Sequence, residues 1–383
     1  MTGRQWAWAL LPGALLFGLV VAVTQTGLLD RLRGAFPPVE ELTVERVTLA
    51  PGLISLAVVN GGPEPVTIAQ VSVDEAFRQF TMAPSTTLNR LGRATIAIPY
   101  AWVQDEAHLV TLLTSTGLTF EHPIPLAVET PTTDSSSLGL LTLIGIFVGV
   151  LPVAVGLLFL PLISRLPEDR FEVMLALTAG LLIFLGVEAL FEALETAAEV
   201  PAAFQGTALV LLGSLGAFLT LQLASPGAPF QTGADGRLAA GWFIALGIGL
   251  HNLGEGLAIG AAYAIGEAAL SAFLVTGFMI HNTTEGLAIV APVAKDHPRL
   301  TTLAGMAALA GLPTIVGAWI GGLAFTPTLA TLFIAVGVGA IAQVVALLFR
   351  MFSRSGEGIW RPSIAGGVLA GLAIMYVTGL LVR

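Results

Sequence analysis

Two short motifs determine how this sequence is interpreted: residues 251–256 are His-Asn-Leu-Gly-Glu-Gly, and residues 281–286 are His-Asn-Thr-Thr-Glu-Gly. In both motifs a glutamate follows the histidine by four positions, so the two side chains lie on one face of an α-helix. Apolar residues surround both motifs. Because an ionisable side chain inside a membrane helix costs about 2.5–3.5 kcal/mol on insertion scales, the repetition of such a pair indicates a function.

The composition around the motifs is that of an integral membrane protein. Of the 383 residues, 55% are hydrophobic and 11% are charged, whereas about 25% of the residues of an ordinary soluble domain are charged. Apolar segments of about 18 residues or more can cross a bilayer as helices, which satisfy their own backbone hydrogen bonds. We expect an all-α bundle of eight such segments, at residues 138–164, 171–194, 204–224, 238–264, 267–292, 300–323, 327–349 and 363–382.

The two motif helices should form an antiparallel hairpin, because only a few residues around 265–267 connect them. Their polar faces then meet, and His251, Glu255, His281 and Glu285 converge. Two imidazoles and two carboxylates suit zinc, and also iron, manganese, cobalt, nickel or cadmium. The chain has no cysteine, which excludes disulfides and thiolate ligands. The sequence therefore predicts a divalent-metal site inside the membrane.

The asparagine after each histidine has two alternative roles. Asn252 and Asn282 lie about 100° around the helix from the histidines, and they could supply further oxygen ligands or donate hydrogen bonds that orient a ligand. In a purely structural interpretation, each His–Glu pair only holds two helices together. Duplication of the motif, together with the Leu-Ala-Ile that follows both copies, favours the metal site.

The chain divides into four parts. Residues 1–29 contain an apolar run that we interpret as an uncleaved anchor rather than a cleaved signal peptide. Residues 30–130 contain alternating segments typical of strands, so we expect a small all-β sandwich outside the cytoplasm. Residues 131–137 are a Pro-, Thr- and Ser-rich linker, and residues 138–383 are the helical core. The expected strands are 53–59, 66–73, 93–99 and 109–113.

Basic residues are concentrated in alternate connections of the core, at Arg165, Arg170, Arg237, Lys295, Arg299, Arg350, Arg354 and Arg361. The positive-inside rule places these connections in the cytoplasm. The β domain and the C-terminus then lie outside, and the chain is a multi-pass protein of the plasma or inner membrane. The net charge of −9 argues against a nucleic-acid partner, because nucleic acids bind clustered Lys and Arg.

Residues 138–383 resemble the ZIP (Zrt-, Irt-like) family of divalent-metal transporters, in particular its prokaryotic GufA-like branch. Members of that family carry motifs of the HNxxEG type on the fourth and fifth of eight helices, where they line the transport pathway. The resemblance implies that the primary metal ligands are His251, Glu255, His281 and Glu285. Asn252 and Asn282 are then polar contributors beside them.

The chain departs from the family pattern in three places. Gly254 and Thr284 stand where members usually have proline. Asn282 and Leu312 stand where members with two adjacent metals have acidic residues, so we expect a single-metal site. Gln343, on the seventh helix, replaces a carboxylate and could face the pathway or a neighbouring helix.

Acidic and basic side chains near the two ends of the pathway are further candidates. Glu188, Glu192 and Glu195 share one face of the second helix and form either a cation entrance or an acidic face at the outer interface. His297 lies in a cytoplasmic loop, where it could receive released metal or be an ordinary solvated residue.

The expected function is transport of a divalent cation towards the cytoplasm by alternating access, with zinc as the first candidate. The metal is the substrate, and no organic cofactor is expected. A metal-binding receptor or sensor, with an unknown ligand of the β domain, is the first alternative. An intramembrane metallo-hydrolase is the second, although neither motif has the HExxH pattern of such enzymes. Membrane lipid and a second copy of the chain are the expected partners, since small-residue faces permit a homodimer.

Overall fold

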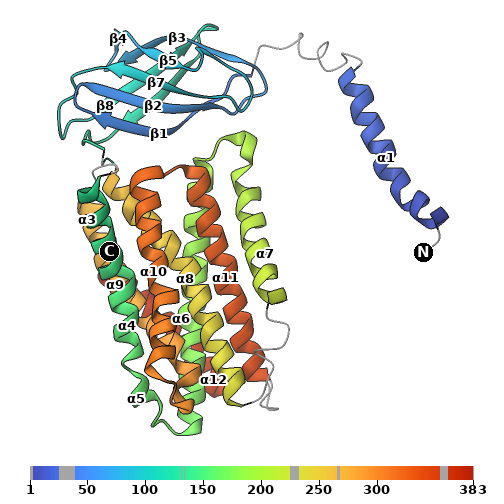
Figure 1. Ribbon diagram of the computed structural model, residues 1–383, viewed down its shortest axis with the longest axis vertical. Helices are drawn as coiled ribbons and strands as arrows, with labels where there is room; N and C mark the ends of the chain where they lie inside the picture. Colours follow the sequence, from blue (N-terminus) through green and yellow to red (C-terminus); the bar gives the residue numbers. More distant parts are fainter. Residues whose placement is uncertain are drawn as a thin grey trace.

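The structure is a computed structural model that describes residues 3–25, 39–130, 132, 134–224, 233–264, 268–353 and 361–382, without the side chains of 3–10, 24, 168, 169, 268–274, 381 and 382. A small β domain stands over one end of a bundle of long helices (Figure 1). The helix α1 (Gly3–Gln25) lies apart from both. Its apolar part, Leu11–Val23, is shorter than a full membrane span, so the N-terminal anchor stays a prediction.

Two antiparallel sheets form the β domain. One has the order β1-β2-β7-β5, with β1 Leu42–Ala50, β2 Leu53–Asn60, β7 Arg93–Pro99 and β5 Thr81–Ala83. The other has the order β4-β3-β8-β9, and β6 pairs with β3. Its strands are β4 Ala76–Arg78, β3 Val66–Val73, β6 Thr87–Leu88, β8 His108–Thr114 and β9 Thr119–Ile124.

Alternating side chains of both sheets share one hydrophobic core, as period-2 patterning requires. Ile54, Leu56 and Val58 of β2 are buried there, with Val71 of β3 and Leu112 of β8 from the other sheet. The four strands expected from the sequence are present. Strands β1 and β9 were missed because charged residues or a proline interrupt their alternation, and β4, β5 and β6 were missed because they are only two or three residues long.

The helical bundle contains the long helices expected from the apolar segments. They are α6 Glu168–Ala198, α7 Gly206–Ala224, α8 Ala234–Ala264, α9 Ala268–Val290, α10 Leu300–Ala324, α11 Pro327–Ser353 and α12 Pro362–Val382. A broken helix precedes them, made of α3 Ser135–Gly145, the π-helical turn η1 Ile146–Val150, α4 Leu151–Leu157 and α5 Leu160–Ile163. It begins three residues before the expected core boundary at 138, because the Asp134 side chain caps it by accepting a hydrogen bond from Ser137 N.

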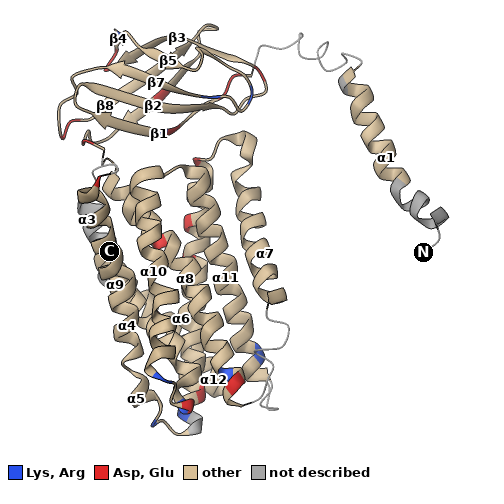
Figure 2. Cartoon of the chain, in the orientation of Figure 1, with Lys and Arg blue, Asp and Glu red and all other residues tan. Residues whose placement is uncertain are grey.

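Within the described residues, seven helices are long and apolar enough to cross a membrane. The broken helix counts as one of them. The eighth expected segment, 267–292, contains α9, and its crossing stays a prediction. Figure 2 shows acidic residues along the helices of the bundle and the bundle's basic residues at the end away from the β domain. This distribution matches the charge pattern of the sequence, while the orientation in the membrane stays a prediction.

Each motif ends in a glycine that lets its helix touch a neighbour. A Cβ on Gly256 of α8 would lie 2.1 Å from the carbonyl oxygen of Thr314 in α10, and a Cβ on Gly286 of α9 would lie 2.2 Å from that of Val153 in α4. Only glycine permits such approaches between backbones. The two motif helices therefore pack in equivalent ways, α8 on α10 and α9 on α4.

Candidate metal site

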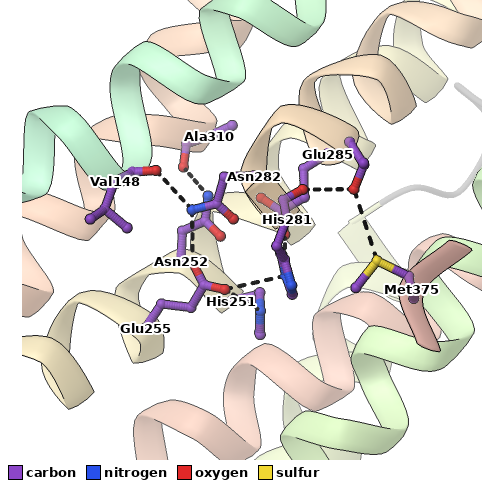
Figure 3. Close-up of polar contacts among 10 residues, drawn as sticks. Val148, His251, Asn252, Glu255, His281, Asn282, Glu285, Ala310 and Met375 are labelled. Atoms are coloured by element: carbon purple, nitrogen blue, oxygen red, sulfur yellow. Dashed lines mark hydrogen bonds and ion pairs between the residues drawn. The ribbon is translucent and has the colours of Figure 1, made fainter. Parts of the chain in front are cut away.

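The four motif side chains meet between α8 and α9 (Figure 3). His251 Nε2 and His281 Nε2 each lie 3.3 Å from the Glu255 Oε1 atom, and His281 Nε2 lies 3.6 Å from Glu285 Oε1. One ligand atom from each of the four residues lies within 4.8 Å of all the others. Within the described part of the chain, no other cluster of three or more His, Asp or Glu side chains meets this spacing.

Burial and hydrogen bonding make this cluster a candidate for a cation. His251, Glu255 and Glu285 are buried. Among the described residues, the Nε2 atoms of both histidines, Glu255 Oε1 and both oxygens of Glu285 have no hydrogen-bond partner. Zinc–ligand bonds of about 2.0–2.2 Å in tetrahedral geometry separate neighbouring ligands by about 3.3–3.6 Å. The three His–Glu separations match these values, and all four ligand atoms lie within 4.8 Å of one another, so a bound metal would satisfy these orphaned atoms.

Asn282 orients one of the carboxylates. Its Nδ2 group donates to Glu255 Oε2 and to the Val148 carbonyl, both at 2.9 Å. Pro152 has no N–H, so the carbonyl four residues before it, that of Val148, lacks the usual helical donor. Asn282 supplies that donor and leaves Glu255 Oε1 turned towards the histidines. Asn252 differs, because its Nδ2 group donates only to the Ala310 carbonyl, at 3.1 Å.

An acidic cavity leads to the site. It has a volume of about 420 Å³, and its lining includes Glu188, Glu192 and Glu195 of α6 together with His251, Glu255 and His281. Phe278 of α9 and Thr378 of α12 complete the walls towards the β-domain end. The acidic face expected from the sequence is therefore continuous with the candidate ligands.

Tight apolar packing closes the opposite side of the site. Leu182 of α6, Ile244 and Ile248 of α8, and Ala288 and Ile289 of α9 are buried in one hydrophobic cluster. A void of about 10 Å³ lies beside Glu285 on this side. Among the described residues, the cavity therefore extends from the site towards the β-domain end of the bundle, and packed apolar side chains lie on the other side.

Three residues singled out in the sequence lie away from the site. His297 is exposed beyond α9, and no cluster of three ligands includes it in the described ranges. Leu312 is 49% exposed and does not fill a position beside the metal ligands. Gln343 is buried on the α11 face that carries Gly339, which approaches Ser214 of α7. Gln343 therefore faces a neighbouring helix rather than the cavity.

A polar cluster in the β domain has a structural role. Asp74 accepts hydrogen bonds from Leu109 N at 2.9 Å and from the Tyr100 hydroxyl at 2.9 Å, and its carboxylate lies 2.8 Å from His108 Nδ1. Burial alone would raise the pKa of Asp74, but the bonds from Leu109, His108 and Tyr100 hold that pKa below its usual value. These bonds fix the β3–β4 turn against the start of β8.

The sequence contains a signal for the supporting helices that the motif search missed. Leu151-Pro152 is followed by Gly156, and Leu312-Pro313 is followed by Gly317 at the same spacing. The first copy lies in α4 behind α9, and the second lies in α10 behind α8. Because α4 and α10 run in opposite directions, the copies form an inverted repeat around the site.

Comparison with known proteins gives no family for this chain. No protein-family model matches it. No curated protein matches it at the significance required. One solved structure with a similarity is the archaellum periplasmic stator protein FlaG from Sulfolobus acidocaldarius, at 11% identity and a TM-score of 0.20 over 22% of this chain and 99% of that chain. A similarity at this score supports no argument about fold or function.

Proposed function

We propose that this chain is a ZIP-like transporter that carries a divalent metal cation across a membrane. The observation that supports the proposal is the convergence of two histidines and two glutamates with unpartnered buried atoms, three of which, His251, Glu255 and His281, line an acidic cavity. A purely structural His–Glu pair would need one histidine for each carboxylate, whereas Glu255 Oε1 lies 3.3 Å from the Nε2 atoms of both histidines. Here the atoms converge on a common point with separations that suit a metal.

The proposed substrate is a borderline divalent ion, with Zn²⁺ first. Imidazole and carboxylate ligands suit Zn²⁺, Fe²⁺, Mn²⁺, Co²⁺ and Ni²⁺. His251 and His281 would supply nitrogen, and Glu255 and Glu285 would supply oxygen. Two carboxylates would neutralise a divalent ion and lower its energy inside the membrane.

The proposed mechanism is alternating access. The ion enters from the β-domain end along Glu188 and Glu192, whose negative charge raises its local concentration. It binds at the four ligands, and it leaves at the other end after the cavity closes and the hydrophobic cluster opens. With the basic connections placed in the cytoplasm, this direction is uptake.

Ion uptake into proteoliposomes tests the proposal. Vesicles containing the purified chain should take up ⁶⁵Zn²⁺, and His251→Ala and Glu285→Ala should each lower that uptake to the background of empty vesicles. His297→Ala is the matched control, because that histidine is exposed and lies away from the site. Equal uptake by all of these proteins would refute the transport site.

A metal-binding receptor is the second candidate, because the β domain is a separate folded unit over one end of the helical bundle. It predicts Zn²⁺ binding that His251→Ala abolishes, without uptake into vesicles. Binding and uptake measured on the same preparation therefore distinguish the two functions.

A further inference from the structure

The β domain touches the helical bundle at two separate places. At one place the Glu41 carboxylate accepts a hydrogen bond from Ala202 N at 2.8 Å, and the Arg93 guanidinium lies over the Phe204 ring at 5.8 Å. Ala202 and Phe204 belong to the turn η2 (Ala202–Phe204), which follows the end of α6. At the other place Arg46 Nη1 donates to the carbonyl of Leu323, in the last turn of α10.

These two places lie on different helices around the metal site. The turn η2 follows the end of α6, which carries Glu188, Glu192 and Glu195. Helix α10 packs against α8, the helix of His251 and Glu255. A Cβ on Gly317 of α10 would lie 2.1 Å from the Leu253 carbonyl oxygen, and one on Gly321 would lie 2.0 Å from that of Leu257. We call α6 the entrance wall and the α8–α10 pair the ligand wall.

The peptide chain also joins the β domain to the ligand wall. Thr130 is held on β1 by two hydrogen bonds with Leu49, at 2.9 Å each. The chain then enters α3, where the Trp319 indole of α10 donates to the Thr142 hydroxyl at 3.0 Å. The peptide chain and the Trp319–Thr142 hydrogen bond therefore join the β domain to the ligand wall, whereas the Glu41 and Arg93 contacts join it to the entrance wall.

We infer that the β domain is a clasp that bridges the two walls and stabilises the cavity-open state. A sandwich with a continuous core is rigid, so it holds its two attachment points at a fixed distance. Closing the cavity moves the entrance wall relative to the ligand wall, and this movement breaks the Glu41–Ala202 bond or the Arg46–Leu323 bond. A cleft of about 430 Å³ lies between the β domain and the helix ends.

The inference rests on the proposed alternating access, and its test uses a measurement that does not require ion flux. The chain has no cysteine, so one introduced thiol reports one position. Thr378→Cys places a thiol in the open cavity, and Ala288→Cys places one in the hydrophobic cluster beyond the site. The ratio of their labelling rates by a small thiol reagent in metal-free buffer reports the balance between the two states.

Loss of the clasp should shift this ratio towards the closed cavity. Glu41→Ala and Arg46→Ala should each lower the Thr378→Cys to Ala288→Cys labelling ratio by about tenfold, the shift expected for one charge-assisted hydrogen bond. Glu106→Ala and Arg78→Ala are the matched controls, because both residues are exposed on the β domain away from these contacts. They should leave the ratio unchanged.

A disulfide between the β domain and the chain beside η2 should restore the open cavity in the Glu41→Ala protein. A Cβ on Gly61 would lie 3.5 Å from Pro201 Cβ, which is a separation suited to a disulfide. It would also lie 2.6 Å from Glu41 Oε1, so the pair is built in the Glu41→Ala background. The oxidised Glu41→Ala, Gly61→Cys, Pro201→Cys protein should label its Thr378→Cys reporter at the original rate, and reduction should reverse this.

The outcomes separate the two proposals. If Glu41→Ala, Arg46→Ala and the disulfide all leave the labelling ratio unchanged, the inference that the β domain is a clasp is refuted, whether or not the protein transports Zn²⁺. A ratio that responds as expected in a protein without ⁶⁵Zn²⁺ uptake supports the clasp and refutes the transporter. If both hold, the oxidised protein should take up Zn²⁺ at least about tenfold more slowly than the reduced one.

Discussion

Replacing Asn282 with leucine should weaken metal binding without removing a proposed ligand. The Asn282 amide donates to Glu255 Oε2 and thereby turns Oε1 of the same carboxylate towards the two histidines. A hydrogen bond to a charged group contributes about 1.5–3 kcal/mol. At about 1.4 kcal/mol per tenfold change, Asn282→Leu should raise the dissociation constant for Zn²⁺ roughly 10- to 100-fold, as expected for a residue that orients a ligand.

The chain offers a matched control for this substitution. Asn252 occupies the equivalent position of the first motif, is equally buried, and donates only to the Ala310 carbonyl. Asn252→Leu should therefore raise the dissociation constant less than about threefold, although it removes one buried hydrogen bond where Asn282→Leu removes two, and both variants lose some thermal stability. Competition for Zn²⁺ with a fluorescent chelator, on detergent-purified protein, measures both constants. Equal weakening by the two substitutions would refute the orienting role of Asn282.

Three further predictions concern the packing, the entrance and the β domain. Gly256→Ala should destabilise the protein by about 1–3 kcal/mol in thermal unfolding, because its Cβ would clash with α10, whereas Gly216→Ala meets open space and should not destabilise it. Glu192→Gln should raise the KM for Zn²⁺ uptake more than it lowers kcat, and an unchanged KM would exclude it from the entrance. The fold holds the pKa of Asp74 below its usual value. The Asp74 carboxylate therefore stabilises the β domain at pH values above its unfolded pKa of about 3.9, and this stabilisation is lost as the pH falls through its lower pKa in the folded protein. Asp74→Asn should remove this acid dependence from the unfolding curve.

The sequence was informative about the fold wherever one physical pattern dominated a segment. Long uncharged segments predicted the helices, because a membrane permits few other structures. Strong alternation predicted β2, β3, β7 and β8. Strand β9 contains Glu121, His122 and Pro123, so its alternation was too weak to recognise. The π-helical turn before Pro152 could likewise not be predicted from the sequence. The Val148 carbonyl, which Pro152 leaves without its usual helical donor, accepts a hydrogen bond from Asn282, far along the chain.

The candidate site was predicted more completely than its surroundings. The spacing of four within each motif brings each histidine to its own glutamate, and the short connection brings the two helices together. The sequence alone left the roles of the asparagines open, placed Leu312 beside the metal position, and left Gln343 facing either the pathway or a neighbouring helix. Their positions depend on how α10 and α11 are rotated against their neighbours, and apolar helices give little sequence information about rotation.

The two motifs by themselves determined which side chains could bind a metal, because helical periodicity places His251 with Glu255 and His281 with Glu285 without reference to the rest of the fold. Tertiary structure alone decided that the four side chains meet beside an acidic cavity, and that Asn282, rather than Asn252, bonds one of the proposed ligands. It also decided that the β domain contacts both η2 and α10. These features depend on packing between distant segments, where glycine contacts and freed carbonyls set the distances between helices.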